Sequence, residues 1–267
     1  MTSMLRKARV LLSVWFASMS AYRAEIFVWM LTGAVPLIML AIWIGKARAS
    51  GGEVGGYTPQ DFAAYFLAAW FSQQWIAAWV AWELDTQIRT GTLSPKLLRP
   101  LNVFWEHVAS HVAERVVRLP FIVLVLLVGL LLVPGTQLTP DVPHVLVYVL
   151  SINLAWAIRF QIAYCIGLLA FWYEQAVAFE ELYFTIAAFL TGAFAPLEFY
   201  PPAVRAAIEW TPFPYLIYYP VRILNGALSW PETVRVLGVQ LVWTLVFWLL
   251  RSWLWRHGLR RYGAVGA

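Results

Sequence analysis

Residues 145–170 read VLVYVLSINLAWAIRFQIAYCIGLLA, and this stretch decides the class of fold. A helix needs about 20 predominantly apolar residues to cross a bilayer, and this run reaches that length with one charged residue, Arg159. Further apolar runs occupy residues 26–44, 62–82, 119–133, 182–196 and 236–253. Because backbone groups in lipid have to be hydrogen-bonded internally, such runs are predicted to be helices. We therefore expect an all-α polytopic membrane protein, a single transmembrane domain over residues 1–267 with six transmembrane helices.

The composition indicates that lipid surrounds most of the chain. Of the 267 residues, 61% are hydrophobic and 12% are charged, whereas about 25% of the residues in a soluble domain are charged. The net charge of +5 comes from basic residues beside the apolar runs, without a basic block of the kind that binds nucleic acid. We expect membrane lipids, and no nucleic acid, among the partners of this chain.

The distribution of basic residues predicts the orientation. Thirteen of the 19 lie before the first span, between the second and third spans, or from the last residues of the sixth span to the end of the chain. With six spans these segments share one side, so both termini are expected in the cytoplasm. Residues 1–25 have an apolar face at helical spacing, which predicts an amphipathic helix in the membrane interface.

Two of the predicted spans are irregular. Pro36 lies inside the first span, where proline is expected to kink a helix. The third apolar run alone would be about 22 Å long, which is short of a bilayer core of about 30 Å. We therefore expect its helix to begin earlier, in the segment after Asn102.

The polar segment 83–118 between the second and third spans has the most specific pattern. It contains Ile88-Arg89-Thr-Gly91-Thr-Leu93, followed by Leu97-Leu98-Arg99-Pro100. This pattern resembles the cytoplasmic loop of type 2 ABC exporter permeases, which includes a coupling helix that docks in a groove of the ATPase subunit. The resemblance implies an ATPase-coupling role here for Glu83, Asp85, Ile88, Arg89, Gly91, Leu93, Leu97, Leu98 and Arg99. The alternative is a solvated loop that merely connects two spans.

A second proline-rich segment, residues 197–226, supports the same resemblance. It contains Glu198-Phe199-Tyr200-Pro201, then Pro212-Phe213-Pro214-Tyr215. In the family, the chain between the fifth and sixth spans re-enters the outer leaflet as short helices that cap the translocation path. By resemblance, Glu198, Phe199 and Tyr200 are candidate path or gate residues.

The resemblance implies a permease subunit of an ATP-driven exporter in a cytoplasmic membrane of the bacterial type. Its substrate would be hydrophobic or amphipathic: a drug, a lipid or a glycan. Its partners would be a pair of ABC ATPase subunits and a second permease, identical or related. The sequence has no Gly-x-x-x-x-Gly-Lys-[Ser/Thr] phosphate loop. We therefore expect no cofactor on this chain, with ATP and Mg bound by the ATPase.

Arg159 is a candidate path residue because an ionisable group inside a span is costly. No acidic residue lies inside a predicted span to pair with it, and Glu180 falls in a small acidic loop. The guanidinium could contact a substrate, clamp a subunit interface or snorkel to the interface. Asn153 and Gln161 flank it and could satisfy it, and Trp156 could stack on it.

The residue pattern argues against three other functions: metal binding, catalysis and ion-coupled transport. His107, His111 and Glu114 have helical spacing, but a solvated helix face is favoured over a metal site, and no metal is expected. A membrane-embedded lipid-modifying enzyme would need a nucleophile with a base, or paired carboxylates. An ion-coupled secondary transporter would need an intramembrane carboxylate. Because the predicted spans contain neither histidine nor acid, we expect no catalytic residues.

Overall fold

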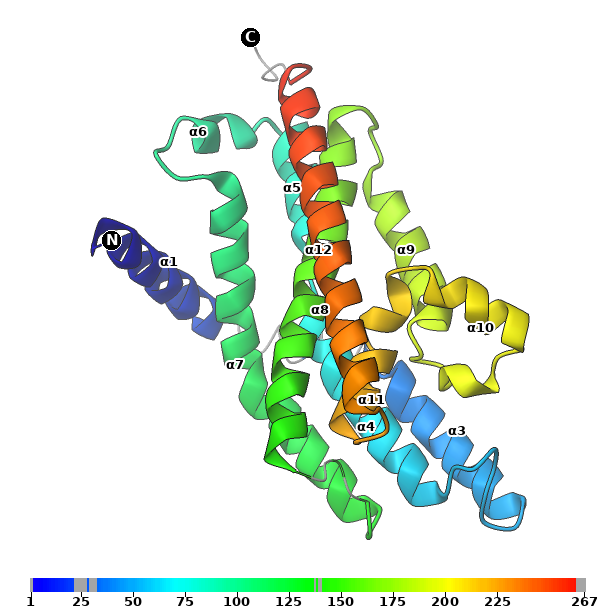
Figure 1. Cartoon of the computed structure of the whole chain (residues 1–267). Coiled ribbons are helices and arrows are strands. Elements are labelled where there is room, and N and C mark those ends of the chain that lie inside the picture. Colours follow the sequence, from blue (N-terminus) through cyan, green and yellow to red (C-terminus); the bar gives the residue numbers. More distant parts are fainter. Residues whose placement is uncertain (1, 22–27, 29–32, 137, 139–140, 263–267) are drawn as a thin grey trace.

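The computed structural model describes all residues except 1, 22–27, 29–32, 137, 139–140 and 263–267. The described residues are helical apart from loops and one isolated bridge between Val54 and Tyr57, which confirms the all-α class. The α-helices shown in Figure 1 are α1 Thr2–Ala21, α3 Val35–Ala49, α4 Pro59–Ile76, α5 Val80–Arg89, α6 Leu93–Leu97, α7 Val103–Leu132, α8 Val142–Leu168, α9 Val177–Leu190, α10 Pro202–Glu209, α11 Tyr218–Leu224 and α12 Trp230–Leu259. Short 3₁₀ turns cover Leu169–Phe171, Leu197–Phe199 and Phe213–Tyr215.

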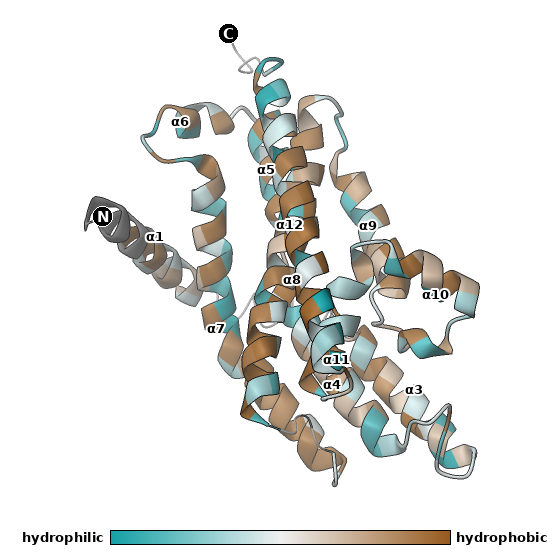
Figure 2. Ribbon diagram, viewed as in Figure 1, coloured by the Kyte–Doolittle hydropathy of each residue, from teal (hydrophilic) through white to brown (hydrophobic). Residues whose placement is uncertain are grey.

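Within the described residues, three helices are long and apolar enough to cross a membrane: α7, α8 with its 3₁₀ extension, and α12. The apolar window of α8 is 61% buried inside the chain, whereas the windows of α7 and α12 are each 17% buried. Helix α8 is therefore the central helix, and α7 and α12 expose many large hydrophobic side chains. Both helices have long hydrophobic stretches in Figure 2. These helices support an integral membrane protein. The count of six spans remains a prediction.

Helix α7 begins at Val103, as expected from the short apolar run that ends it. The Asn102 side chain caps it by accepting from the Phe104 N–H at 2.9 Å. Helix α5 continues to Arg89, so the connection between α5 and α7 is residues 90–102. The predicted loop 83–118 is therefore longer than the connection in the structure, because its first residues belong to α5 and residues 103–118 belong to α7.

The structure corrects two of the other predicted spans. Pro36 stands in the first turn of α3, where its fixed φ favours helix initiation, so it does not kink this helix. The predicted span 62–82 is divided, since α4 ends at Ile76 and α5 begins at Val80. Most of residues 26–34, the first part of the predicted first span, lies outside the described residues.

The segment between α9 and α12 returns to the bundle as short helices, with α11 packed on α8 and α4. Gln240 of α12 fixes this return by donating to the Tyr215 carbonyl at 2.8 Å and the Ser151 carbonyl at 3.1 Å. The Ser151 hydroxyl donates back to Gln240 Oε1 at 3.0 Å. Helix α6 and the C-terminal end of α12 lie together at the opposite end of the bundle (Figure 1).

Helix α8 approaches α5 closely at Gly167. A Cβ atom at Gly167 would lie 2.9 Å from Leu84 Cβ and 3.0 Å from the Ala81 backbone. Both neighbours are held by the helix backbone of α5, so neither can move aside cheaply. The glycine therefore sets the distance between these two helices.

We expect Gly167→Val to destabilise the chain by about 1–3 kcal/mol, because the added methyl groups overpack the α5–α8 contact. The measurement is the thermal unfolding midpoint of the purified chain in detergent. Gly238→Val is the matched control, since a Cβ there meets nothing within 4 Å. Equal midpoints for the two variants would contradict the close approach.

Candidate functional site

The helical run from α4 to α5 is interrupted at residues 77–79, inside the apolar bundle. Ala77 is extended, with φ −54° and ψ 136°, and Ala78 is 1% exposed. A buried, non-helical backbone needs hydrogen-bond partners from elsewhere in the protein. Side chains of neighbouring helices therefore have to supply hydrogen-bond partners for residues 77–79.

One face of α7 supplies these partners. Arg118 donates from Nη1 to the Gln74 carbonyl at 3.0 Å, at the end of α4. The Trp79 N–H donates to His111 Nε2 at 3.0 Å, and the Trp79 indole donates to Glu114 Oε1 at 3.2 Å. Glu114 also pairs with Arg118. We call His111, Glu114 and Arg118 the α7 brace.

The brace fixes the protonation pattern of His111. Because Nε2 accepts from the Trp79 N–H, the ring proton is on Nδ1, which donates to the His107 carbonyl at 2.9 Å. His107 and His111 are each 2% exposed. The interpretation of these histidines as a solvated face was therefore wrong. Within the described residues there is no group of three or more metal-ligating side chains.

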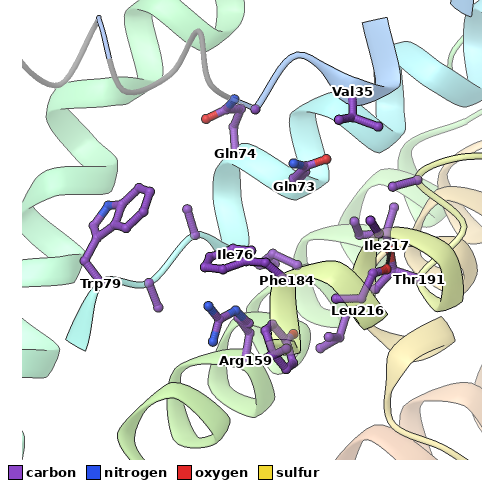
Figure 3. A pocket seen from close by; sticks show the side chains of 17 residues that line it. Val35, Gln73, Gln74, Ile76, Trp79, Arg159, Phe184, Thr191, Leu216 and Ile217 are labelled. Carbon is purple, nitrogen blue, oxygen red and sulfur yellow. Dashed lines mark hydrogen bonds between the residues drawn. The ribbon is translucent and has the colours of Figure 1, made fainter. Parts of the chain in front are cut away.

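A cavity of about 270 Å³ borders the same break. Its walls are mostly apolar and come from the start of α3, the break, α9 and residues 216–217. Figure 3 shows Arg159 on one side of this cavity and Gln73 on another, with Phe184 between them and Ile217 to one side, near Thr191. We call it the Arg159 cavity.

Arg159 has an acidic partner that the sequence analysis missed. It pairs with Glu180, which lies in the first turn of α9 and is 0% exposed. The guanidinium carbon lies 4.3 Å from the Tyr183 ring centroid and 5.2 Å from that of Phe184. Glu180 is therefore not in a loop, and Arg159, 3% exposed, does not snorkel.

The pairing is incomplete on both sides. Among the described residues, neither Arg159 Nη1 nor Glu180 Oε2 has a hydrogen-bond partner. Arg159 also lines the cavity. The Nη1 atom itself is buried and does not open on the cavity, but an unpaired buried N–H donor is costly and can bind an oxygen acceptor that comes within reach.

The residues expected to satisfy Arg159 bind elsewhere. Trp156 stacks on Arg115, whose guanidinium carbon is 3.9 Å from its ring centroid. Asn153 Oδ1 accepts from Arg115 Nη1 at 3.4 Å. Gln161 donates to the Thr244 carbonyl of α12 at 3.1 Å. These contacts hold α8 against α7 and α12, so the expectation was wrong.

Glu198 lies away from the Arg159 cavity and stabilises the 197–226 segment. Its Oε1 accepts from the Tyr218 hydroxyl at 2.8 Å and pairs with Arg222 Nη1 at 3.0 Å. Arg222 also donates to the Tyr57 hydroxyl at 3.1 Å. Burial raises the pKa of Tyr57 to about 12, so this hydroxyl stays neutral.

Phe199 and Tyr200 have the same bracing role. The Phe199 ring centroid lies 4.6 Å from that of Trp43. Tyr200 donates its hydroxyl to the Phe189 carbonyl at 2.7 Å. Neither residue, nor Glu198, lines the Arg159 cavity. The structure therefore does not bring these candidate residues together with Arg159.

The 90–102 connection divides the predicted coupling residues into two groups. Leu93 is 0% exposed and Ile88 is 6% exposed, and both pack with Val103 against Phe171, Trp255 and Tyr262. They are internal anchors of the connection, and their ATPase-coupling role remains a prediction. Leu98, by contrast, is 88% exposed, and Leu97 is 38% exposed.

Polar contacts stiffen this connection. Gly91 takes φ +74°, the left-handed conformation that turns the chain after α5. Asp85 pairs with Arg89 at 2.8 Å, and Lys96 pairs with Glu106 at 2.9 Å. Glu83 lies 3.7 Å from His107 Nε2, and Arg99 is exposed beside Leu98. The exposed Leu97 and Leu98 at the end of α6 are therefore held by a connection that is itself fixed by ion pairs and buried leucine and isoleucine side chains.

Sequence reasoning missed the α7 brace and the Arg159–Glu180 pair. His111, Glu114 and Arg118 recur at i, i+3 and i+7, which places them on one helix face. That periodicity was a usable signal for a polar contact inside the bundle. Glu180 offered no comparable signal, because its partner is distant in the sequence.

The comparisons with known proteins agree with this architecture. A family model described as ABC-2 family transporter protein matches residues 35–266. A search of curated proteins gave no match. The matched range covers every helix from α3 to α12, including the 90–102 connection, the α7 brace and the Arg159–Glu180 pair. The chain therefore belongs to the ABC-2 transporter family and is a membrane component of an ABC transporter.

Proposed function

We propose that the chain is the permease subunit of an ATP-driven exporter that moves a hydrophobic or amphipathic substrate out of the cytoplasm or inner leaflet. The observation that carries the proposal is the exposed Leu98 directly after α6, on a connection whose Ile88 and Leu93 are buried. An exposed leucine beside Arg99 suits a groove on a partner, and a stiff base transmits the partner's motion. The ATPase subunit that normally works with this family is the proposed partner.

The contacts of α6 suggest how motion would pass into the membrane. Leu93 packs in one cluster with Phe171 at the end of α8 and Trp255 of α12. Ser94 lies in hydrogen-bond contact with Tyr262, with 3.1 Å between their hydroxyls. Because packed side chains transmit displacement instead of absorbing it, a shift of α6 would move the cytoplasmic ends of α8 and α12 together.

Helix α7 offers a route from α6 to the Arg159 cavity. Lys96 of α6 pairs with Glu106 near the start of α7, and the brace lies farther along the same continuous helix. The brace holds the α4–α5 break, which forms one wall of the cavity. Motion of α6 would therefore reach the cavity wall through one rigid element.

The Arg159 cavity is the proposed substrate contact. Its apolar walls suit the body of an amphipath, and Arg159, which lines it, has a buried Nη1 donor that a shift of the side chain would present to a substrate. Because Glu180 neutralises the guanidinium charge, the cavity favours a neutral group with an acceptor oxygen over a free anion.

The remaining assignments rest on the charge distribution and on the family. We propose a cytoplasmic membrane of the bacterial type, with both termini, α6 and the 90–102 connection in the cytoplasm. A second permease, identical or related, would complete the transporter. The 197–226 segment would then lie on the outer side as a cap.

A specific observation favours one second candidate, an ion-coupled transporter. Glu180 is a fully buried carboxylate that the sequence analysis had placed in a loop, and buried carboxylates serve in proton relays. Substrate movement driven by a pH gradient in vesicles that contain the chain alone would support this candidate. Abolition of that movement by Glu180→Gln would identify the group responsible.

The purified chain alone is expected to show no ATP hydrolysis, since its sequence has no phosphate loop. The measurement is phosphate release by the chain in detergent, with an ATPase of known activity as the positive control. Turnover that remains with the chain through further purification would contradict the permease assignment.

Leu98→Asp is expected to weaken association with the ATPase about tenfold or more while leaving the chain folded. Burying a leucine contributes about 1.5–3 kcal/mol, and about 1.4 kcal/mol is a factor of ten in affinity. The measurement is the affinity of the ATPase for the chain in detergent, with the unfolding midpoint as a check on folding.

Val142→Asp is the matched control for this test. Val142 is 69% exposed and begins α8 at the opposite end of the bundle, so the same apolar-to-acidic change should leave association intact. If Leu98→Asp binds the ATPase as tightly as Val142→Asp does, α6 is not the docking element.

Arg159→Ala is expected to destabilise the chain by about 3–5 kcal/mol, because it leaves Glu180 buried without a partner. The double variant Arg159→Met/Glu180→Met should recover stability but not export. The measurements are the unfolding midpoint and ATP-dependent movement of a fluorescent neutral amphipath in vesicles. Full export by the stable double variant would show that the pair is purely structural.

A further inference from the structure

A second cavity, of about 560 Å³, lies between the 197–226 segment and the first half of α12. It is distinct from the Arg159 cavity, and no residue lines both. We call it the α12 groove. Its lining combines charged, aromatic and aliphatic side chains, which sets it apart from the long hydrophobic stretches of α7 and α12.

The lining changes character along α12. Glu232 and Arg235 line the groove near the start of the helix, and Val236, Val239 and Val242 line it farther along. These residues follow one helix face and extend over about 15 Å at 1.5 Å per residue. Because α12 is a membrane-length helix, the groove runs from a charged end into an apolar part of the bundle. A lipid has the same arrangement, with a charged headgroup at one end and apolar acyl chains at the other.

The formal charges at and beside the charged end of the groove balance. Arg205 pairs with Glu209 at 3.0 Å, and Arg222 pairs with Glu198 at 3.0 Å. Glu232 accepts from the Ser229 N–H at 2.8 Å and its hydroxyl at 2.6 Å. The formal charges of these groups and Arg235 sum to zero. A net anion or a net cation therefore gains little here over a headgroup that carries both charges.

Arg235 is available to a ligand. It is exposed and, among the described residues, makes no ion pair and no side-chain hydrogen bond. Beside it, the rings of Tyr215 and Tyr219 are stacked with centroids 4.8 Å apart. A guanidinium matches a phosphate group, and an aromatic face next to the Glu209 carboxylate matches an ammonium group.

We propose that the α12 groove binds a phospholipid with a zwitterionic headgroup. Arg235 holds the phosphate, and the ammonium lies over the Tyr215–Tyr219 pair near Glu209. An acyl chain follows Val239, Val242 and Trp243 toward the middle of the membrane. This inference needs only that the chain is a membrane protein and does not depend on ATP-driven export.

The test uses the purified full chain in a neutral maltoside detergent and measures lipid binding by native mass spectrometry. Dioleoyl phosphatidylethanolamine is the zwitterionic probe, dioleoyl phosphatidylglycerol is the anionic probe with the same chains, and glycerophosphoethanolamine is the headgroup alone. We expect phosphatidylethanolamine to bind most tightly. The headgroup alone should bind at least tenfold more weakly, because it makes no contact with the valine face.

Arg235→Gln is expected to weaken phosphatidylethanolamine binding about tenfold, since a charge-assisted contact to the phosphate is lost. Arg48→Gln is the matched control, because Arg48 is exposed at the end of α3 and outside the groove. Val242→Gln tests the apolar face and should weaken binding of the lipid but not of glycerophosphoethanolamine. Val242 is 60% exposed, so this change leaves the fold intact.

Several results would overturn the proposal. These are phosphatidylglycerol binding as tightly as phosphatidylethanolamine, or equal losses in Arg235→Gln and Arg48→Gln. Equal binding of the lipid and its free headgroup would exclude a role for the valine face. A change of oligomeric mass in Val242→Gln without a change in lipid binding would show that another copy of the chain covers the groove.

Discussion

The rest of the structure depends on the hydrogen bonds between α7 and the interrupted backbone of α4 and α5. A non-helical stretch in an apolar bundle loses water as a partner, and each unpaired group costs several kcal/mol. Arg118 and His111 bind the two sides of the break, and Glu114 holds both Trp79 and Arg118. These bonds allow the break to exist, and they also fix how α7 packs against its neighbours.

The break forms part of the wall of the Arg159 cavity. Arg159 enters it from α8, the central helix, and Glu180 enters from α9. A buried ion pair is weak evidence for stability, because desolvation offsets much of the attraction. Its incomplete hydrogen bonding is more informative, because Arg159 lines the cavity and its buried Nη1 donor has no partner among the described residues. The membrane part therefore has a specific polar contact inside an otherwise apolar space.

The α6 end of the bundle and the α12 groove follow the same physical rule with different outcomes. At α6 the leucines that face inward anchor the connection, and the leucine that faces outward remains free for a partner. In the α12 groove the paired arginines brace the 197–226 segment, and Arg235 remains free. In each place contacts within the chain use most of the polar and apolar groups, and the proposals of an ATPase and a lipid rest on the groups that remain.

The sequence by itself determined the class of the protein and the position of its apolar segments. Hydropathy over 20 or more residues is a local property, so the long helices α7, α8 and α12 and the early start of α7 could be predicted. The resemblance at Ile88–Arg89 and Leu97–Leu98 also located the connection between α5 and α7. Tertiary structure alone decided that Leu93 faces inward, that α4 and α5 are separate, and that Glu180 pairs with Arg159. Those facts depend on contacts between helices far apart in the sequence, and a hydropathy pattern describes only how polar each segment is, not which segment it meets.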